Sequence, residues 1–389
     1  MRQFKCLMPK VISFGPGKAR ELARSVAGKK ILVMGDPGVK SSGAVRAALD
    51  AIGADAAAVR EFWDIVAEPT EQQITDIVAA VDMPGLDAIV AVGGGSAMDT
   101  AKFVSVMAQG GPSMEDLFAG RFSGKRKASL IMVPTTAGSG SEATPNSIAL
   151  RPKLNLKVGV VCEEFMADQV ILDPELLVGL PPNVTAATGL DALCHALECY
   201  VSNKANPVSD MFAMESMRLT FKSLRTAVAD GADIEARGET QLAAFYGGVC
   251  IACSGTNAVH ALSYPLGGRY RIPHGVSNAV LLAPVFAYNK DACVEKLAMV
   301  ADLAARASGT SLGGMNDSDK ADYLVDYLAR LAQDLKIPAS LEELGIGPED
   351  LDLLVDAAFE VKRLLDNNPK PLSKDDIRVI YTGILTRRS

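Results

Sequence analysis

Histidine is scarce in this chain of 389 residues, which contains only three, His195, His260 and His274. All three lie in the second half of the sequence. So few imidazoles are poor material for a histidine-based site. A single site that used all three would also leave none for any other step of a reaction.

The chain also lacks an excess of positive charge and any long apolar run. Lys and Arg number 39 against 46 Asp and Glu, the net charge is −7, and the basic residues are scattered among acidic ones. This pattern argues against nucleic acid as a partner. Apolar runs such as 86–92 and 279–287 end long before the roughly 20 residues that a membrane helix needs. We therefore expect neither nucleic acid nor a membrane as a partner.

A secretory signal is missing as well, because charges interrupt the first ten residues, MRQFKCLMPK. We therefore expect a cytoplasmic protein. The seven cysteines are an odd number in a chain without a signal, which favours reduced thiols over a disulfide framework. Cys250 and Cys253 have CxxC spacing but no second pair, so we expect them to be small core residues. The composition, 49% hydrophobic and 22% charged, is that of an ordinary globular protein.

The pattern of apolar residues along the sequence changes near residue 180. Before it, short aliphatic runs at 30–36, 86–92 and 129–133 alternate with Ala-rich stretches of helical periodicity, such as 44–52, as in βα units. Continuously apolar strands need cover on both faces, which predicts a mostly parallel sheet flanked by helices. After it, helical patterns follow at 183–202, 207–227, 240–253, 320–335 and 348–365. We predict an α/β domain over residues 1–180 and an all-α domain over 181–389.

The strand at 86–92 ends in a run of three glycines that includes Gly94 and Gly95. Glycines between a strand and a helix let the backbone approach a phosphate, which the helix amino terminus attracts. Ser96, followed three residues later by Asp99, fits an N-cap. Glycine turns also occur in α/β folds for steric reasons alone, so this loop by itself leaves the choice open.

A second small-residue loop follows the strand at 129–133 and contains Thr135, Thr136 and Ser139. Two such loops favour a nucleotide, whose pyrophosphate they can surround. Asp36, at the end of the first strand, suits a ribose hydroxyl and would repel a 2′-phosphate, which favours NAD over NADP. An ordinary turn residue is the alternative for Asp36. It precedes the glycines, so this is not the usual GxGxxG signature.

A candidate metal site lies in the second half. Asp191 and His195 are four residues apart on an apolar, helical segment, so they share one face of a buried helix. A buried Asp–His hydrogen bond without metal is the simpler interpretation of this pair alone. His260 and His274 also stand in apolar surroundings. Three imidazoles and a carboxylate suit a divalent first-row metal, either zinc or iron(II).

Six motifs follow one another along the chain. They are GGGSxxDxxK at 93–102, PTTAGSGSE at 134–142, DPE at 173–175, GLDALCHAxE at 189–198, HAxxYPLG at 260–267 and PHGxxNA at 273–279. In this order they resemble the iron-containing, or group III, alcohol dehydrogenases, over most of the chain. The resemblance implies a dehydroquinate synthase-like fold with an amino-terminal dinucleotide-binding domain, a helical carboxy-terminal metal-binding domain, an active site in the cleft between them and a homodimer.

The resemblance also assigns residues. It implies that Asp191, His195, His260 and His274 hold the metal, which is iron(II) with zinc as the alternative. The implied cofactor is NAD, with NADP as the alternative, and its contacts fall on Asp36, Gly94, Gly95, Ser96, Asp99, Thr135, Thr136, Asn146 and Lys157. Ser139, in the second loop, completes the expected cofactor site.

The chain departs from the family at Tyr264, where many relatives have a further histidine near the nicotinamide. A proton relay through that imidazole cannot operate here, so Tyr264 is the candidate catalytic residue, with water as the alternative. Arg269 and Arg271 either face solvent or steer a substrate that carries a carboxylate or phosphonate. The expected function is a metal-dependent, NAD(P)-linked alcohol dehydrogenase or aldehyde reductase acting on a small primary alcohol or aldehyde, including one with an acidic group.

Other functions remain open at this point. A metal-dependent hydrolase or lyase would use the glycine loop to hold a substrate phosphate. A non-catalytic nucleotide sensor would use the metal structurally, since structural metals prefer four protein ligands. Within the same family, a maleylacetate reductase-like enzyme is the closest alternative, and the intact set of metal ligands argues against it.

Overall fold

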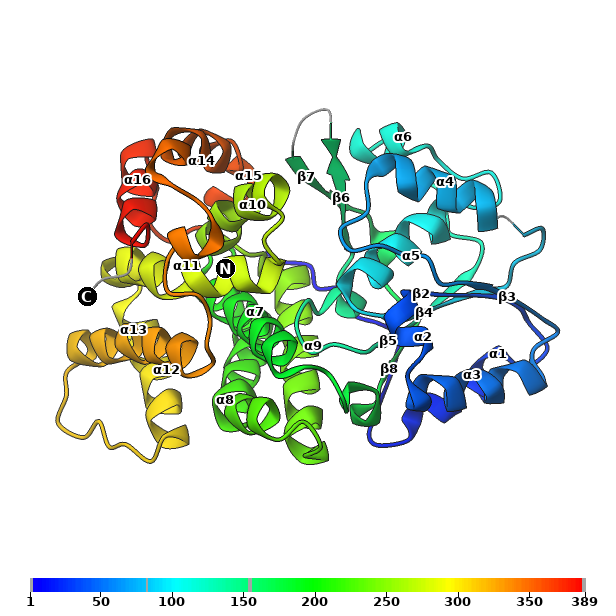
Figure 1. The fold of residues 1–389 in the computed structure, drawn as a ribbon, viewed down its shortest axis with the longest axis horizontal. Helices are drawn as coiled ribbons and strands as arrows, with labels where there is room; N and C mark the ends of the chain where they lie inside the picture. Colours follow the sequence, from blue (N-terminus) through cyan, green and yellow to red (C-terminus); the bar gives the residue numbers. More distant parts are fainter. Residues whose placement is uncertain (1–2, 82, 153–155, 387–389) are drawn as a thin grey trace. The chain divides into compact units, whose positions relative to one another are not determined.

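The chain forms two compact units, which a computed structural model describes over residues 3–81, 83–152 and 156–386 (Figure 1). The α/β unit comprises Leu7–Leu180 and Ala232–Gln241. The helical unit comprises Met1–Cys6, Pro181–Gly231 and Leu242–Ser389. A parallel sheet in the first unit and helices in the second confirm the predicted fold class.

The two units differ from the domains predicted by a single boundary at residue 180 in two short segments. Residues 232–241 count with the α/β unit, where Arg237 Nη2 donates to the carbonyl of Leu180 at 3.1 Å and Gln241 Nε2 to that of Pro134 at 3.2 Å. Residues 1–6 count with the helical unit, where a disulfide joins Cys6 to Cys253. These contacts link residues that are far apart in sequence, so no local pattern reveals them.

The α/β unit is built on a six-stranded sheet whose strand pairs are all parallel. In spatial order the strands are β1 (Val11–Phe14), β8 (Gln169–Leu172), β5 (Ser129–Pro134), β4 (Ala88–Gly93), β2 (Lys30–Gly35) and β3 (Ala58–Phe62). Gly35 pairs with Val92, and Gly93 pairs with Pro134. The carboxyl ends of β2, β4 and β5 therefore lie side by side, which brings the loops that follow them to one edge of the sheet.

Helices cover both faces of this sheet, as the buried strands β2, β4 and β5 require. Figure 1 shows α1 (Leu22–Val26) and α3 (Gly43–Asp55) on one side, and α4 (Glu71–Val81) and α5 (Gly95–Met107) on the other. The unit also contains α2 (Pro37–Lys40), α6 (Met114–Phe118) and a hairpin of β6 (Asn146–Arg151) and β7 (Leu156–Val161). The core around α5 includes Phe103, whose ring meets that of Phe165 edge to face.

The helical unit contains one large hydrophobic core. Its main helices are α7 (Pro182–Val201), α8 (Pro207–Ala229), the part of α9 (Ile234–Ser254) from Leu242 onward, α10 (Ala258–Tyr270), α11 (His274–Asn289), α12 (Val294–Ala307), α13 (Asp317–Asp334), α14 (Leu351–Phe359), α15 (Lys362–Leu365) and α16 (Lys374–Gly383). Nearly every residue of α7 from Thr185 onward is buried. Gly275 packs so tightly on this helix that a Cβ there would lie 2.4 Å from the carbonyl oxygen of Ala187. Glycine thus lets the start of α11 reach α7.

Two expectations drawn from the sequence are corrected here. The segment 348–365 is not one helix, because Val361, with φ −80° and ψ 50°, interrupts it between α14 and α15. The cysteines are not all reduced, because Cys6 and Cys253 form the disulfide described above. The other five are free, and all but Cys162 are buried.

No single helix in the described part of the chain is long and apolar enough to cross a membrane. The pair α9 and α10 reaches that length and composition only together, and it is bent by 108° at its break.

Candidate functional site

The four predicted metal ligands come together in the helical unit. Asp191 and His195 lie one turn apart on α7, His260 lies in the first turn of α10, and His274 is the first residue of α11. One ligand atom from each residue lies within 4.8 Å of the others. From Asp191 Oδ1, the Nε2 atoms of His195, His260 and His274 are 3.7, 3.9 and 3.8 Å away.

These distances fit a divalent cation. Metal bonds of about 2.1 Å would place tetrahedral ligand atoms roughly 3.4 Å apart, so only small inward movements complete the site. The side chain of His274 is 28% exposed, whereas those of the other three ligands are 4–6% exposed. The cluster is therefore reached from the side of His274. Such access is what a catalytic metal needs and a structural metal does not.

Neighbouring groups shift the pKa values of two of the ligands. Burial raises the pKa of the Asp191 carboxyl, but the three histidines and the Asn278 amide lower it more, so the net pKa lies below its ordinary value. Asp191 is thus an ionised ligand. Burial lowers the pKa of His260, but the carboxylate of Glu198 more than offsets this, and the net pKa is raised.

Two further residues contact the ligands, and sequence reasoning gave neither a role. Glu198 Oε2 is hydrogen-bonded to His260 Nδ1. Asn278 Nδ2 donates to Asp191 Oδ1 at 2.6 Å and lies 3.1 and 3.2 Å from Nε2 of His260 and His274. The signal for Glu198 was available, because it follows His195 by three residues in a helix that is apolar all round. A carboxylate buried there requires a partner.

Tyr264 lies one turn after His260 on α10 and is buried. Its ring centre is 6.4 Å from that of His274, so it borders the ligand cluster. Arg269 and Arg271 are exposed. Arg271 ends α10 with a φ of 54°, and the Arg269 guanidinium lies 6.0 Å from the centre of the Tyr270 ring.

The predicted cofactor loops meet in the α/β unit at the carboxyl edge of the sheet. A Cβ on Gly94 would lie 3.3 Å from side-chain atoms of Thr136, and one on Gly95 would lie 3.0 Å from those of Ser139. Asp36 is beside them, because its Oδ2 lies 3.2 Å from a Cβ built on Gly93. Its Oδ1 accepts from the backbone N–H of Val39 at 3.0 Å and so caps α2. Asp36 is therefore both a helix cap and a neighbour of the glycine loop.

The predicted N-cap at Ser96 is wrong. Helix α5 begins at Gly95 with Gly94 as its N-cap, and no side chain caps it. The Ser96 hydroxyl instead accepts from the backbone N–H of Glu68 at 3.0 Å. Glu68 in turn pairs with Lys157 Nζ at 2.5 Å. These contacts join two predicted cofactor residues, Ser96 and Lys157, through Glu68, to which the sequence analysis assigned no role.

Lys102, on α5, binds the second loop and the segment that follows it from inside the unit. Its ammonium group donates to the carbonyl and hydroxyl of Ser141, both at 2.7 Å, to Thr144 Oγ1 at 3.0 Å and to the carbonyl of Asn146 at 2.5 Å. Burial lowers the pKa of Lys102 to about 8. In the sequence, Lys102 is only the last position of the motif at 93–102, whereas in the structure its side chain holds the second loop.

Two acids accompany Lys102. The predicted cofactor residue Asp99 accepts from the hydroxyl of Ser141 and from the backbone N–H of Ile148 at 3.0 Å, so its carboxylate also holds the second loop in place. Burial raises the pKa of Asp99. Burial raises the pKa of Glu142 to about 7. The three groups form a buried ionisable cluster beneath the loops.

The close fit of Gly95 against Ser139 leads to a testable expectation. In Gly95→Ala the new methyl group lies 3.0 Å from Ser139, inside the optimal carbon contact of about 3.5–4.0 Å, and must push the loops apart. We expect the Kd for NADH, measured by fluorescence titration, to rise about tenfold, which is about 1.4 kcal/mol. Gly43→Ala is the matched control, since a Cβ there meets nothing within 4 Å. Equal Kd values for both variants would remove Gly95 from the cofactor site.

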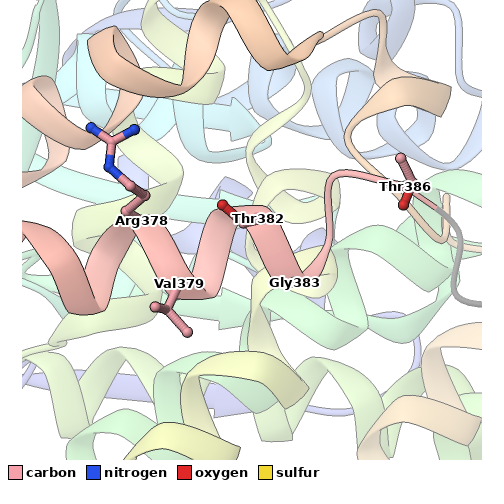
Figure 2. A pocket seen from close by; sticks show the side chains of 5 residues that line it. All are labelled: Arg378, Val379, Thr382, Gly383 and Thr386. Carbon is pink, nitrogen blue, oxygen red and sulfur yellow. The ribbon is translucent and has the colours of Figure 1, made fainter.

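A surface hollow lies elsewhere in the helical unit. It is lined by Arg378, Val379, Thr382, Gly383 and Thr386, on and after α16 (Figure 2). Its one charged side chain, Arg378, forms an ion pair with Asp352 at 2.6 Å. None of the four candidate metal ligands lines it, so this hollow is not part of the site.

Comparison with known proteins relates these features to a family. Residues 9–174 match the family described as "Iron-containing alcohol dehydrogenase", and residues 185–385 match "Fe-containing alcohol dehydrogenase family, C-terminal". The chain is 37% identical to long-chain-alcohol dehydrogenase 1 of Geobacillus thermodenitrificans (strain NG80-2), over 97% of this chain and 95% of the relative. It is 32% identical to the NAD-dependent methanol dehydrogenase of Bacillus methanolicus, over 97% and 99%.

Solved structures agree with this relationship. The crystal structure of a 1,3-propanediol oxidoreductase superposes with a TM-score of 0.92 at 33% identity, covering 99% of this chain and all of the other. The similarity therefore extends over both compact units.

Proposed function

Because this chain belongs to the iron-containing alcohol dehydrogenase family and is an oxidoreductase, we propose that it interconverts a small primary alcohol and its aldehyde with NAD(H) as the hydride carrier. The observation that carries this proposal is the convergence of Asp191, His195, His260 and His274 on one point. Small-residue loops at the ends of adjacent strands supply the second requirement, a place for a dinucleotide.

We assign the metal as iron(II), which the family description supports; the ligand set alone suits zinc equally well. When bound, the metal would supply a Lewis acid that polarises the substrate oxygen. Asp191 contributes the negative charge that a divalent ion requires, and Asn278 holds the orientation of Asp191 Oδ1 through its 2.6 Å hydrogen bond. The partial exposure of His274 leaves a path for substrate.

The proposed cofactor site is the carboxyl edge of the sheet. Asp36 would accept a hydrogen bond from the adenosine ribose and disfavour a 2′-phosphate, so we propose NAD rather than NADP. The pyrophosphate would lie against the two loops and the start of α5. The residues assigned to this site are Asp36, Gly94, Gly95, Ser96, Asp99, Thr135, Thr136, Ser139, Asn146 and Lys157.

Tyr264 is the proposed proton donor or acceptor of the reaction, because all three histidines are assigned to the metal. We expect Tyr264→Phe to lower kcat by about 10²-fold, the lower end of what general acid–base catalysis contributes, with metal content unchanged. The measurement is kcat as a function of pH for the wild type and the variant. An unchanged kcat and pH profile would mean that water or the ribose, and not Tyr264, exchanges the proton with the substrate.

Substrate range, assembly and location complete the proposal. The exposed Arg269 and Arg271, which lie between His260 and His274 in the sequence, would favour substrates that carry an acidic group.

A homodimer is proposed because the edge strand β1 leaves Val11, Ile12 and Phe14 51%, 41% and 40% exposed, and an apolar strand edge favours pairing. A cytoplasmic location remains the expectation from the sequence.

The test is a panel of small alcohols and aldehydes, with and without acidic groups, assayed with NAD(H) and NADP(H) on protein of measured metal content. Alcohol-dependent reduction of NAD by the metal-loaded protein is expected. NADH binding and metal binding without turnover across the panel would favour a nucleotide sensor. Hydrolysis or elimination of a phosphate-bearing substrate without any NADH binding would favour a hydrolase or lyase.

A further inference from the structure

Glu198 is fully buried on α7, three residues after His195, and its two carboxylate oxygens have different partners. Oε2 is hydrogen-bonded to His260 Nδ1. Oε1 accepts from the backbone N–H groups of Asn257 and Val259, at 3.0 and 2.7 Å. One side chain therefore joins α7 to both the start of α10 and a metal-ligating imidazole.

We propose that Glu198 is a positioning residue that fixes the proton of His260 on Nδ1 and so directs the lone pair of Nε2 toward the metal. This inference rests on the proposed metal centre. A neutral imidazole has one donor and one acceptor nitrogen, and its tautomer follows from the partner of the other nitrogen. Asn278 Nδ2, an amide nitrogen that can only donate, lies 3.1 Å from His260 Nε2, so Nε2 is the acceptor and Nδ1 is the donor to Glu198 Oε2. The acceptor atom Nε2 is also the one that lies 3.9 Å from Asp191 Oδ1, on the side of the ligand cluster.

A purely structural role is the alternative. Carboxylates stabilise helix amino termini by accepting their unpaired N–H groups, and Glu198 Oε1 does this for α10. The two roles use different oxygens, so one isosteric substitution separates them. In Glu198→Gln the amide oxygen can still accept from the backbone of α10. The amide NH₂ then faces His260 Nδ1 and must donate to it, which moves the imidazole proton to Nε2 and removes the lone pair from the metal.

The experiment uses the full-length protein, stripped of metal and titrated with Zn²⁺ against a chromophoric chelator. We expect Glu198→Gln to weaken Zn²⁺ binding by about 10–100-fold, the usual effect of losing a partner that orients a metal-ligating histidine. The ¹⁵N NMR spectrum of histidine-labelled, metal-free protein, recorded at alkaline pH where the imidazole is neutral, should show His260 change from the Nδ1–H to the Nε2–H form. Circular dichroism verifies that the fold is retained.

Asn257→Ala is the matched control. Asn257 caps α10 by accepting from the N–H of Ala258 at 2.7 Å, and it donates to the backbone carbonyl of Glu198 rather than to its carboxylate. This variant should lower the thermal midpoint while leaving the His260 tautomer and the Zn²⁺ affinity unchanged. If capping alone explains Glu198, Glu198→Gln will keep the wild-type Zn²⁺ affinity, because its amide oxygen still accepts from the backbone of α10.

The outcomes separate this inference from the proposed function. Wild-type Zn²⁺ affinity in folded Glu198→Gln, or an Nε2–H tautomer in the wild-type protein, would overturn the positioning role even if the enzyme oxidises alcohols. The wild-type tautomer can be measured even if the variant does not fold. Conversely, the predicted tautomer change and loss of Zn²⁺ affinity would support Glu198 even if no alcohol is turned over, in which case only the proposed function fails.

Discussion

Substituting His260 with alanine is expected to remove the metal and abolish turnover. His260 supplies one of four ligand atoms, and the chain has no spare histidine to replace it. Lewis-acid stabilisation by a metal contributes several kcal/mol, so its loss should lower kcat/KM by roughly 10³-fold or more at about 1.36 kcal/mol per tenfold. The measurements are metal content after gel filtration and the rate of NADH formation.

Two controls make this result specific. NADH binding should survive in His260→Ala, because the assigned cofactor residues all belong to the α/β unit, whereas His260 belongs to the helical unit. Treating the wild-type protein with a chelator should reproduce the variant, and added metal should restore activity only to the wild type. A variant that kept both its metal and its turnover would show that His260 is not a ligand.

Lys102→Met is expected to cause the largest loss of stability. The substitution leaves Asp99 and Glu142 without their buried cation and removes four hydrogen bonds that hold the second loop. Breaking a buried ion pair by removing one partner costs about 3–5 kcal/mol. Urea unfolding followed by Trp63 fluorescence measures this loss in the α/β unit, because Trp63 is the only tryptophan and is buried there.

The loss should depend on pH in a defined direction. The folded pKa of Glu142 is about 7 against an ordinary value of 4.5, so between these values the folded state holds a proton that the unfolded state releases, and stability falls as pH rises. Without the attraction of Lys102, the pKa values of Glu142 and Asp99 rise further, and this fall becomes steeper. The cost of Lys102→Met should therefore shrink when the pH is lowered from 7 toward 5.

Lys125→Met is the control for this prediction. The same substitution in the same unit removes only an exposed ion pair with Glu164, which solvent screens and which contributes little to stability. Equal losses in the two variants would mean that the buried cluster contributes no more than a surface pair. Of these two variants, only Lys102→Met should weaken NADH binding, because Lys102 contacts the second loop and the Lys125 ammonium group pairs with Glu164.

The strands that could be predicted are those buried on both faces. β2, β4 and β5 read as continuous apolar runs because helices cover both sides of the sheet. The edge strand β3, with the sequence AVREF, is mostly exposed and shows no such run, so it escaped prediction. The four-residue strand β8 is too short to stand out, although it is mostly buried. A strand could therefore be predicted only where it was buried on both faces and long enough to form a continuous apolar run.

Two of the wrong predictions share a physical origin. An N-cap at Ser96 was the local optimum, but Gly94 adopts the extended cap conformation without a side chain and frees Ser96 to accept from Glu68. The disulfide joins cysteines 247 residues apart, a contact that no spacing rule reaches. In each case a partner distant in sequence prevailed over a local pattern.

The amino-acid sequence alone was sufficient to identify the candidate ligands, because a chain with three histidines offers few combinations and a buried carboxylate one turn from His195 needs a partner. It also placed the loops at strand ends, since glycine and hydroxyl residues interrupt apolar runs there. Only the folded chain revealed Glu198, Asn278 and Lys102 as the residues that orient these groups. Their contacts join elements that are distant in sequence, and the periodicity of one element does not specify which residues of another element it will meet.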